Sequence, residues 1–116
     1  MFYINGTEKI KDAKEKLRGG EGTIVFEKFF PDDKIPKGYK VLAEMVLAPG
    51  SSVGRHEHHG ESEVYYVLAG TGEITVNGET QQVKAGDVAV CHSGSWHSAK
   101  NTSDRELRFL ALIVFE

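Results

Sequence analysis

The sequence predicts an all-β domain, a sandwich or barrel of short strands, from three observations. Segments rich in β-branched and aromatic residues recur along the chain, with turn residues about every 8–12 positions. Helical periodicity is scarce outside the N-terminal segment. The chain has 116 residues, of which 40% are hydrophobic and 27% charged, which fits one globular domain with one core.

The N-terminal segment is the exception to the β pattern. Over residues 7–18 apolar side chains recur at helical spacing, and a Gly-Gly pair follows as a stop signal. This pattern predicts a short helix, with an extended arm as the alternative if tertiary contacts override it. We therefore expect residues 1–21 to form an N-terminal arm or short helix packing on a barrel made by residues 22–116.

The remaining chain divides into strands at its turn residues. A Pro-Asp-Asp turn ends the first strand and a Pro-Gly pair ends the second, while Asn77-Gly78 is a strong signal for a two-residue hairpin. The last strand is the longest apolar run, far too short to span a bilayer. The predicted strands are residues 23–30, 39–47, 63–68, 73–76, 80–83, 88–91, 95–100 and 107–115, together with the segment around residues 56–58.

A histidine cluster is the main chemical signal. His56 and His58 would project from the same face of a strand, about 7 Å apart, because side chains alternate along it. Glu63 opens the returning strand and can point into the same interior, and His97 comes from a distant hairpin. His59 takes the opposite face and is expected at the surface. Imidazoles and a carboxylate suit Mn, Fe, Co, Ni, Cu or Zn better than Ca or Mg.

The spacing around these residues resembles the two conserved motifs of the cupin superfamily. The first motif is matched by Gly50, His56, His58, Glu63 and Gly70, and the second by Gly86, His92, Gly94, His97 and Asn101. One position departs, since cupins usually carry proline where this chain has His92. The sequence around the motifs is similar to that of small single-domain bacterial cupins of the cupin 2 conserved barrel type.

The resemblance implies a double-stranded β-helix, or jelly-roll, barrel with one metal ion inside. Carried over residue by residue, it makes His56, His58, Glu63 and His97 the metal ligands, for one first-row transition-metal ion. Cupins commonly dimerise through terminal strands, and apolar residues 2–4 suggest a homodimer here.

The expected function is that of a metal-dependent enzyme acting on a small oxygen-bearing molecule, by decarboxylation, isomerisation or dioxygenation. The alternative is a non-catalytic cupin that binds or senses a small ligand, with the metal serving affinity and stability. Tyr65, on the inward face with Glu63, and His92 are the candidate catalytic residues. The motifs place no second carboxylate at the site, which counts against an oxalate-decarboxylase mechanism that needs a proton donor.

Charge and cysteine content limit the kinds of partner and the cellular location that we expect. The net charge of −3 and the absence of a basic patch argue against nucleic acid and anionic membrane surfaces. Cys91 is the one cysteine, so no disulfide can form within the chain and a cytoplasmic location is expected. We expect Cys91 to be a buried, inert side chain.

Overall fold

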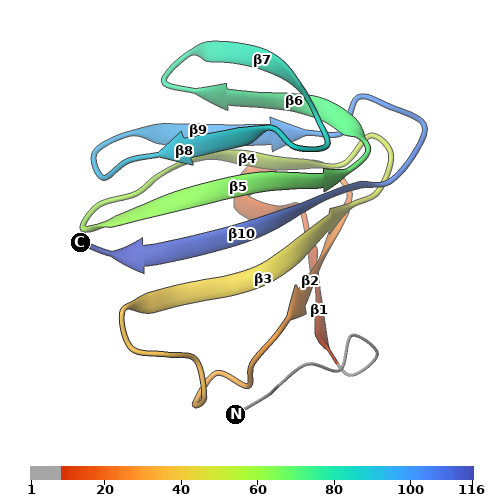
Figure 1. The fold of residues 1–116 in the computed structure, drawn as a ribbon. Coiled ribbons are helices and arrows are strands. Elements are labelled where there is room, and N and C mark those ends of the chain that lie inside the picture. Colours follow the sequence, from red (N-terminus) through yellow and green to blue (C-terminus); the bar gives the residue numbers. More distant parts are fainter. Residues whose placement is uncertain (1–8) are drawn as a thin grey trace.

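The computed structural model describes residues 9–116, which form ten strands in two antiparallel sheets (Figure 1). In spatial order, the larger sheet consists of β1 (Ile10–Glu15), β2 (Thr23–Lys28), β3 (Tyr39–Leu47), β10 (Leu107–Phe115), β5 (Glu61–Ala69) and β8 (Val88–Cys91). The smaller sheet consists of β4 (Ser52–Glu57), β9 (Trp96–Lys100), β6 (Thr71–Val76) and β7 (Glu79–Lys84). The prediction of an all-β jelly-roll barrel is confirmed.

The core lies between the two sheets because each strand turns one side of its alternating pattern inward. β10 shows this best: Leu107, Phe109 and Ala111 are fully buried, while Arg108 and Leu110 between them face the other side. β10 pairs with β3 on one side and β5 on the other, so it runs through the middle of the larger sheet (Figure 1).

The hairpin predicted at Asn77-Gly78 joins β6 and β7. Both residues have positive φ, 48° and 86°, as a two-residue turn of this kind requires. Local turn chemistry therefore places this hairpin correctly from sequence.

The helix predicted over residues 7–18 is wrong where the structure describes that segment. Residues Ile10–Glu15 form β1, which pairs with β2, and a 3₁₀ turn η1 (Leu17–Gly19) follows. Ile10 and Ala13 are exposed, so the apolar spacing does not mark a core-facing stripe. Pairing with a neighbouring strand overrides weak helical periodicity, and the extended alternative is the one observed.

Two further expectations concern dimer formation through the N-terminal residues and the absence of a membrane-spanning segment. Residues 2–4, on which the dimer prediction rested, lie outside the described residues. From residue 9 onward, the chain contains no helix that is long and apolar enough to cross a membrane.

Candidate metal centre

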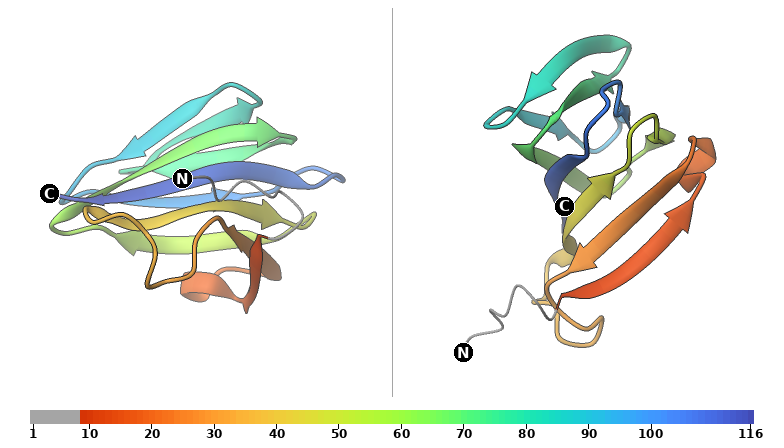
Figure 2. Two further views of the ribbon diagram at one scale, coloured as in Figure 1. Left: turned by 60° about the horizontal axis from the view of Figure 1, so that its bottom comes forward. Right: turned by 90° about the vertical axis from the view of Figure 1, so that its right-hand side faces the viewer.

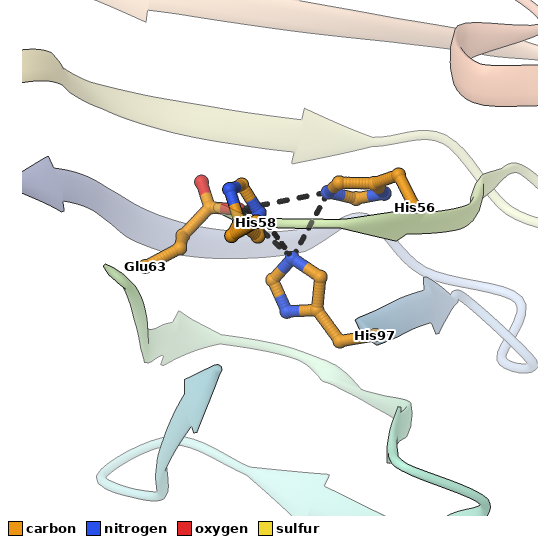
Figure 3. A group of neighbouring side chains, drawn as sticks. All are labelled: His56, His58, Glu63 and His97. Carbon is orange, nitrogen blue, oxygen red and sulfur yellow. Dashed lines mark hydrogen bonds and ion pairs between the residues drawn. The ribbon is translucent and has the colours of Figure 1, made fainter. Parts of the chain in front are cut away.

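Strands of both sheets, together with the residue that follows β4, carry the four residues of the expected metal site, which lie together inside the barrel (Figure 3). His56 in β4 is paired directly with His97 in β9. Glu63 lies in β5 of the other sheet, and His58 follows the last residue of β4. One donor atom from each residue lies within 4.8 Å of all the others. The structure thus gathers the residues that the sequence motifs identified.

The local backbone of β4 decides which histidines point inward. A β-bulge lies between Val53 and His56, and bulges redirect side chains near functional sites. His58 is 4% exposed and turned into the barrel. The next residue, His59, is exposed and lies against the Glu57 carboxylate at 2.8 Å. The expectation that His58 points in and His59 points out is confirmed.

The distances within the cluster are short and similar to one another. Nε2 of His97 lies 2.9 Å from Nε2 of His56 and 3.1 Å from Nε2 of His58. Oε1 of Glu63 lies 2.9 Å from Nε2 of His97, 3.1 Å from that of His58 and 3.7 Å from that of His56. Two donors that bind one ion at about 2.1 Å and at right angles lie about 3 Å apart. The spacing fits donors that share an ion.

Contacts of Nδ1, the ring nitrogen that points away from the cluster, fix the tautomers of His56 and His58. Nδ1 of His56 lies 2.8 Å from the carbonyl oxygen of Gly54, which can only accept, so Nδ1 carries the hydrogen. Nδ1 of His58 donates in the same way to Oε2 of Glu61 at 2.8 Å. In the neutral rings Nε2 is then unprotonated and faces the cluster. Two nitrogen lone pairs converge with the carboxylate of Glu63, an arrangement that a cation stabilises.

The electrostatics of the cluster favour a positive charge at its centre. Burial opposes ionisation of Glu63, but the contacts with His56, His58 and His97, whose Nε2 atoms donate to Glu63 when they are protonated, outweigh burial and hold the pKa of the carboxyl far below 4.5. A hydrogen bond to Glu63 raises the pKa of His58 against the effect of burial, with a further contribution from Glu61. Burial lowers the pKa of His97. A proton on His58 or a metal ion can supply the charge that Glu63 requires.

Of the two candidate catalytic residues, Tyr65 lies at the cluster. Its ring is 1% exposed and stacks on the ring of His97, with centroids 4.7 Å apart and planes 12° apart. Burial and the charge and hydrogen bonding of Glu63 raise the pKa of the Tyr65 hydroxyl well above 10. Tyr65 therefore holds its proton and supports the ring of His97.

His92 is not brought to the cluster. It lies between β8 and β9 with its side chain exposed. It is not among the residues that line a cavity beside the cluster. Its neighbour Cys91 is fully buried, as expected, and burial followed by the charge of Glu63 raises the pKa of the Cys91 thiol to about 11.

A cavity of about 150 Å³ adjoins the cluster. It is lined by the polar residues Arg18, Lys40, His56, His58, Glu61, Glu63 and Tyr65 and by the apolar residues Leu17, Phe26, Val41, Met45, Val53 and Ile113. Two cations and one carboxylate in this set, Arg18, Lys40 and Glu61, were not identified from the sequence.

Glu61 corrects the expectation that no second carboxylate lies at the site. It accepts a hydrogen bond from His58 and forms an ion pair with Lys40 at 2.8 Å. Burial raises its pKa, but Lys40 and His58 outweigh burial and keep the pKa below 4.5. Glu61 lies two positions before Glu63, so the alternation that grouped Tyr65 with Glu63 also places Glu61 inward.

Comparison with known proteins agrees with this architecture. A family model described as a cupin domain (Cupin_2) matches residues 43–114, well over half of the chain. An oxalate-binding protein of Thermotoga maritima is 38% identical over 113 residues, which cover 97% of this chain and 93% of the relative. An uncharacterized protein of Methanocaldococcus jannaschii is 34% identical over 91 residues, covering 78% of this chain and 71% of the relative.

Solved structures show the same fold. The crystal structure of a predicted oxalate decarboxylase from Thermotoga maritima superposes with a TM-score of 0.92 at 37% identity, covering 97% of this chain and 98% of that chain. The polyketide cyclase RemF from Streptomyces resistomycificus superposes with a TM-score of 0.79 at 22% identity, covering 100% and 80% of the two chains, and shows likeness of fold alone. With the family model, the close relative and the two-sheet barrel in agreement, this chain belongs to the cupin family.

Proposed function

We propose that the chain holds one first-row transition-metal ion with His56, His58, Glu63 and His97 and uses this centre to bind a small carboxylate such as oxalate. The observation that carries the proposal is the convergence of imidazole lone pairs and one carboxylate oxygen at mutual distances of about 3 Å, as expected of donors around one ion. When bound, such an ion acts as a Lewis acid toward carboxylate oxygen.

The chain's own residues support this role by orienting the donors. The Gly54 carbonyl and the Glu61 carboxylate fix the tautomers of His56 and His58, and the Tyr65 ring stacks on His97. His58, Glu63 and His97 are buried away from bulk water, which strengthens the electrostatic interactions among the donors.

The choice of a carboxylate ligand rests on charge and on similarity. Arg18 and Lys40 line the cavity together with two carboxylates and an apolar wall. Lys40 is paired with Glu61, so among the described residues Arg18 is the cation in this lining whose charge is left for an anionic ligand. The similar protein of Thermotoga maritima is an oxalate-binding protein. A cavity of about 150 Å³ suits a molecule of a few heavy atoms.

Binding fits the surrounding groups better than decarboxylation does. Loss of CO₂ from oxalate needs a proton delivered to the new C–H bond. Tyr65 has a pKa raised well above 10, and Glu61 is held ionised by Lys40 and His58, so neither is a ready donor. We therefore favour the non-catalytic alternative over the enzyme that the sequence first suggested.

Two measurements test the proposal. Elemental analysis of the purified protein is expected to find about one first-row metal ion per chain, and calorimetry is expected to detect oxalate binding that chelation of the metal abolishes. Protein without such a metal even after reconstitution, or metal-loaded protein without affinity for oxalate, would contradict it. Formation of formate and CO₂ from oxalate would instead establish the enzymatic alternative.

A further inference from the structure

The turn between β1 and β2 reaches the cavity beside the metal centre. Within η1, Leu17 packs against the hydrophobic core, and the next residue, Arg18, lines the cavity together with the ligand residues. The turn lies against β4, the strand that carries His56 (Figure 2 shows the β1–β2 hairpin at the side of the barrel). A cation from a segment remote in sequence thus stands at the site.

The backbone holds Arg18 in an unusual conformation. Its φ of 55° and ψ of 30° lie in the left-handed region, as does Lys16 with a φ of 51°. For residues other than glycine this conformation is energetically unfavourable. Such strain persists where surrounding structure fixes it, and it is found preferentially at functional sites.

Contacts with β4 fix the turn in place. The backbones of Ser52 and Glu21 are joined by a hydrogen bond of 2.9 Å, and the Glu21 N–H also donates to the Ser52 hydroxyl. A Cβ atom on Gly54 would lie 2.0 Å from the carbonyl oxygen of Arg18, so only glycine permits this approach. Gly54 is also the residue whose carbonyl orients His56. The position of Arg18 is therefore tied to that of a ligand histidine.

The charge of Arg18 is not neutralised by the described part of the protein. Among residues 9–116 no carboxylate forms an ion pair with it, whereas Lys40 pairs with Glu61 and Arg108 with Glu27.

We propose that Arg18 is a specificity residue that binds the second carboxylate of a small dicarboxylate whose first carboxylate lies at the His/Glu centre. This inference rests on the proposed function. A guanidinium binds a carboxylate through two parallel hydrogen bonds, which neither Lys40 nor the apolar lining can provide. A monocarboxylate makes no use of Arg18, so the residue separates ligands with two carboxylates from ligands with one.

The experiment compares two substitutions in the same turn. Arg18→Gln and Lys16→Gln remove the same charge from neighbouring left-handed positions, but Lys16 does not line the cavity. Each variant is loaded with the metal found in the purified protein and titrated calorimetrically with oxalate and, separately, with formate. We expect Arg18→Gln to weaken oxalate binding roughly 10- to 100-fold, the loss of a charge-assisted hydrogen-bonded pair. Formate binding by Arg18→Gln, and oxalate binding by Lys16→Gln, should change less than about threefold.

The controls separate this inference from the proposed function. Metal content and thermal midpoint should be unchanged in Arg18→Gln, and Arg18→Lys should recover part of the oxalate affinity because it restores a point charge. If Arg18→Gln binds oxalate as Lys16→Gln does, or if it loses metal, the specificity role is wrong although the metal centre stands. If the metal-loaded wild type binds no oxalate, the proposed function fails and this inference fails with it.

Discussion

His58 and His59 are neighbours in sequence with opposite environments, so they provide a matched test of the metal centre. We expect His58→Ala and His97→Ala to lower metal affinity at least about tenfold, because each removes one of four donors. His59→Ala should retain the wild-type metal content, since His59 faces solvent. Metal per chain after dialysis, measured by elemental analysis, gives the answer. Equal losses in the His58 and His59 variants would mean that the ligand assignment is wrong.

Glu61 offers a second test at the level of single residues. Replacing it by Ala removes the acceptor that fixes the tautomer of His58, so metal affinity should fall roughly 10- to 100-fold. Glu57→Ala is the control, because it removes a similar contact to the exposed His59. Competition with a metal-sensitive chelating dye measures both affinities. Unchanged affinity in Glu61→Ala would show that His58 needs no such support.

The sequence predicted the His/Glu cluster but not the residues around it. Motif spacing identifies His56, His58, Glu63 and His97 because the ligands follow fixed turns and strand alternation. Arg18 gives no such signal, since its approach depends on the pairing of β1 with β2 and on a backbone contact with Gly54. Lys40 is found only once β3 is placed beside the cavity.

Among the structural elements, the β1–β2 turn packs backbone against backbone on β4, the strand that carries His56. Gly54→Ala places a Cβ atom 2.0 Å from the Arg18 carbonyl oxygen and 2.9 Å from the Gly20 nitrogen, so the turn must move. We expect a loss of about 2 kcal/mol in the free energy of unfolding, typical of overpacking, together with weaker metal binding through His56.

Gly19→Ala is the matched control for this substitution. Gly19 has a φ of 81°, but no atom lies within 4 Å of the position that a Cβ would take there, so only the backbone conformation is penalised, by roughly 1 kcal/mol. Urea unfolding of both variants compares the two costs. Equal destabilisation with unchanged metal affinity would show that the contact with β4 does not matter.

β1 itself shows why an edge element is hard to predict. Most of its side chains are exposed, so no hydrophobic alternation marks it as a strand. Its pairing with β2 depends on a turn in which Lys16 and Arg18 adopt left-handed conformations that non-glycine residues rarely take. The central strands were predictable because burial imposes the period of two on their sequence.

For the whole molecule, stability is expected to depend jointly on pH and metal. Because the pKa of His58 is raised, its charged form stabilises the metal-free fold below about pH 6.5, and this contribution is lost as pH rises through the folded-state pKa. Metal binding requires neutral imidazoles and so gains strength over the same rise. Glu63 stays ionised throughout, because its pKa is held far below 4.5.

The increase in melting temperature on adding metal should therefore grow from about pH 5 to pH 8. Scanning calorimetry with and without metal measures it, and His58→Ala should flatten the dependence. A metal-induced increase that is constant over this range would contradict imidazole ligation.

The homodimer stays a prediction, and the larger sheet adds a second surface on which it can form. Tyr66 and Leu68 in β5 and Val88 in β8 are 44%, 41% and 57% exposed on its outer side. Exposed apolar residues at a sheet edge favour pairing with another copy. We expect light scattering to show a dimer at tens of micromolar, roughly the range in which weak pairs persist.

Two variants separate the surfaces that could form the dimer. Deleting residues 1–5 tests the N-terminal segment, and Val88→Lys tests the outer side of β8, with exposed Gln81→Lys on the smaller sheet as control. Loss of the dimer in one variant assigns the interface. A full-length protein that is already monomeric at this concentration contradicts the prediction.

The origin of Arg18 outside the ligand-bearing strands has a practical consequence for protein engineering. The proposed metal donors are encoded in and beside β4, β5 and β9, whereas the proposed carboxylate contact is encoded in a short hairpin turn near the N-terminus. A combinatorial library confined to residues 16–19 leaves every donor and Gly54 intact. Selecting such a library for new ligands would therefore change what the barrel recognises while each member keeps the same four candidate metal donors.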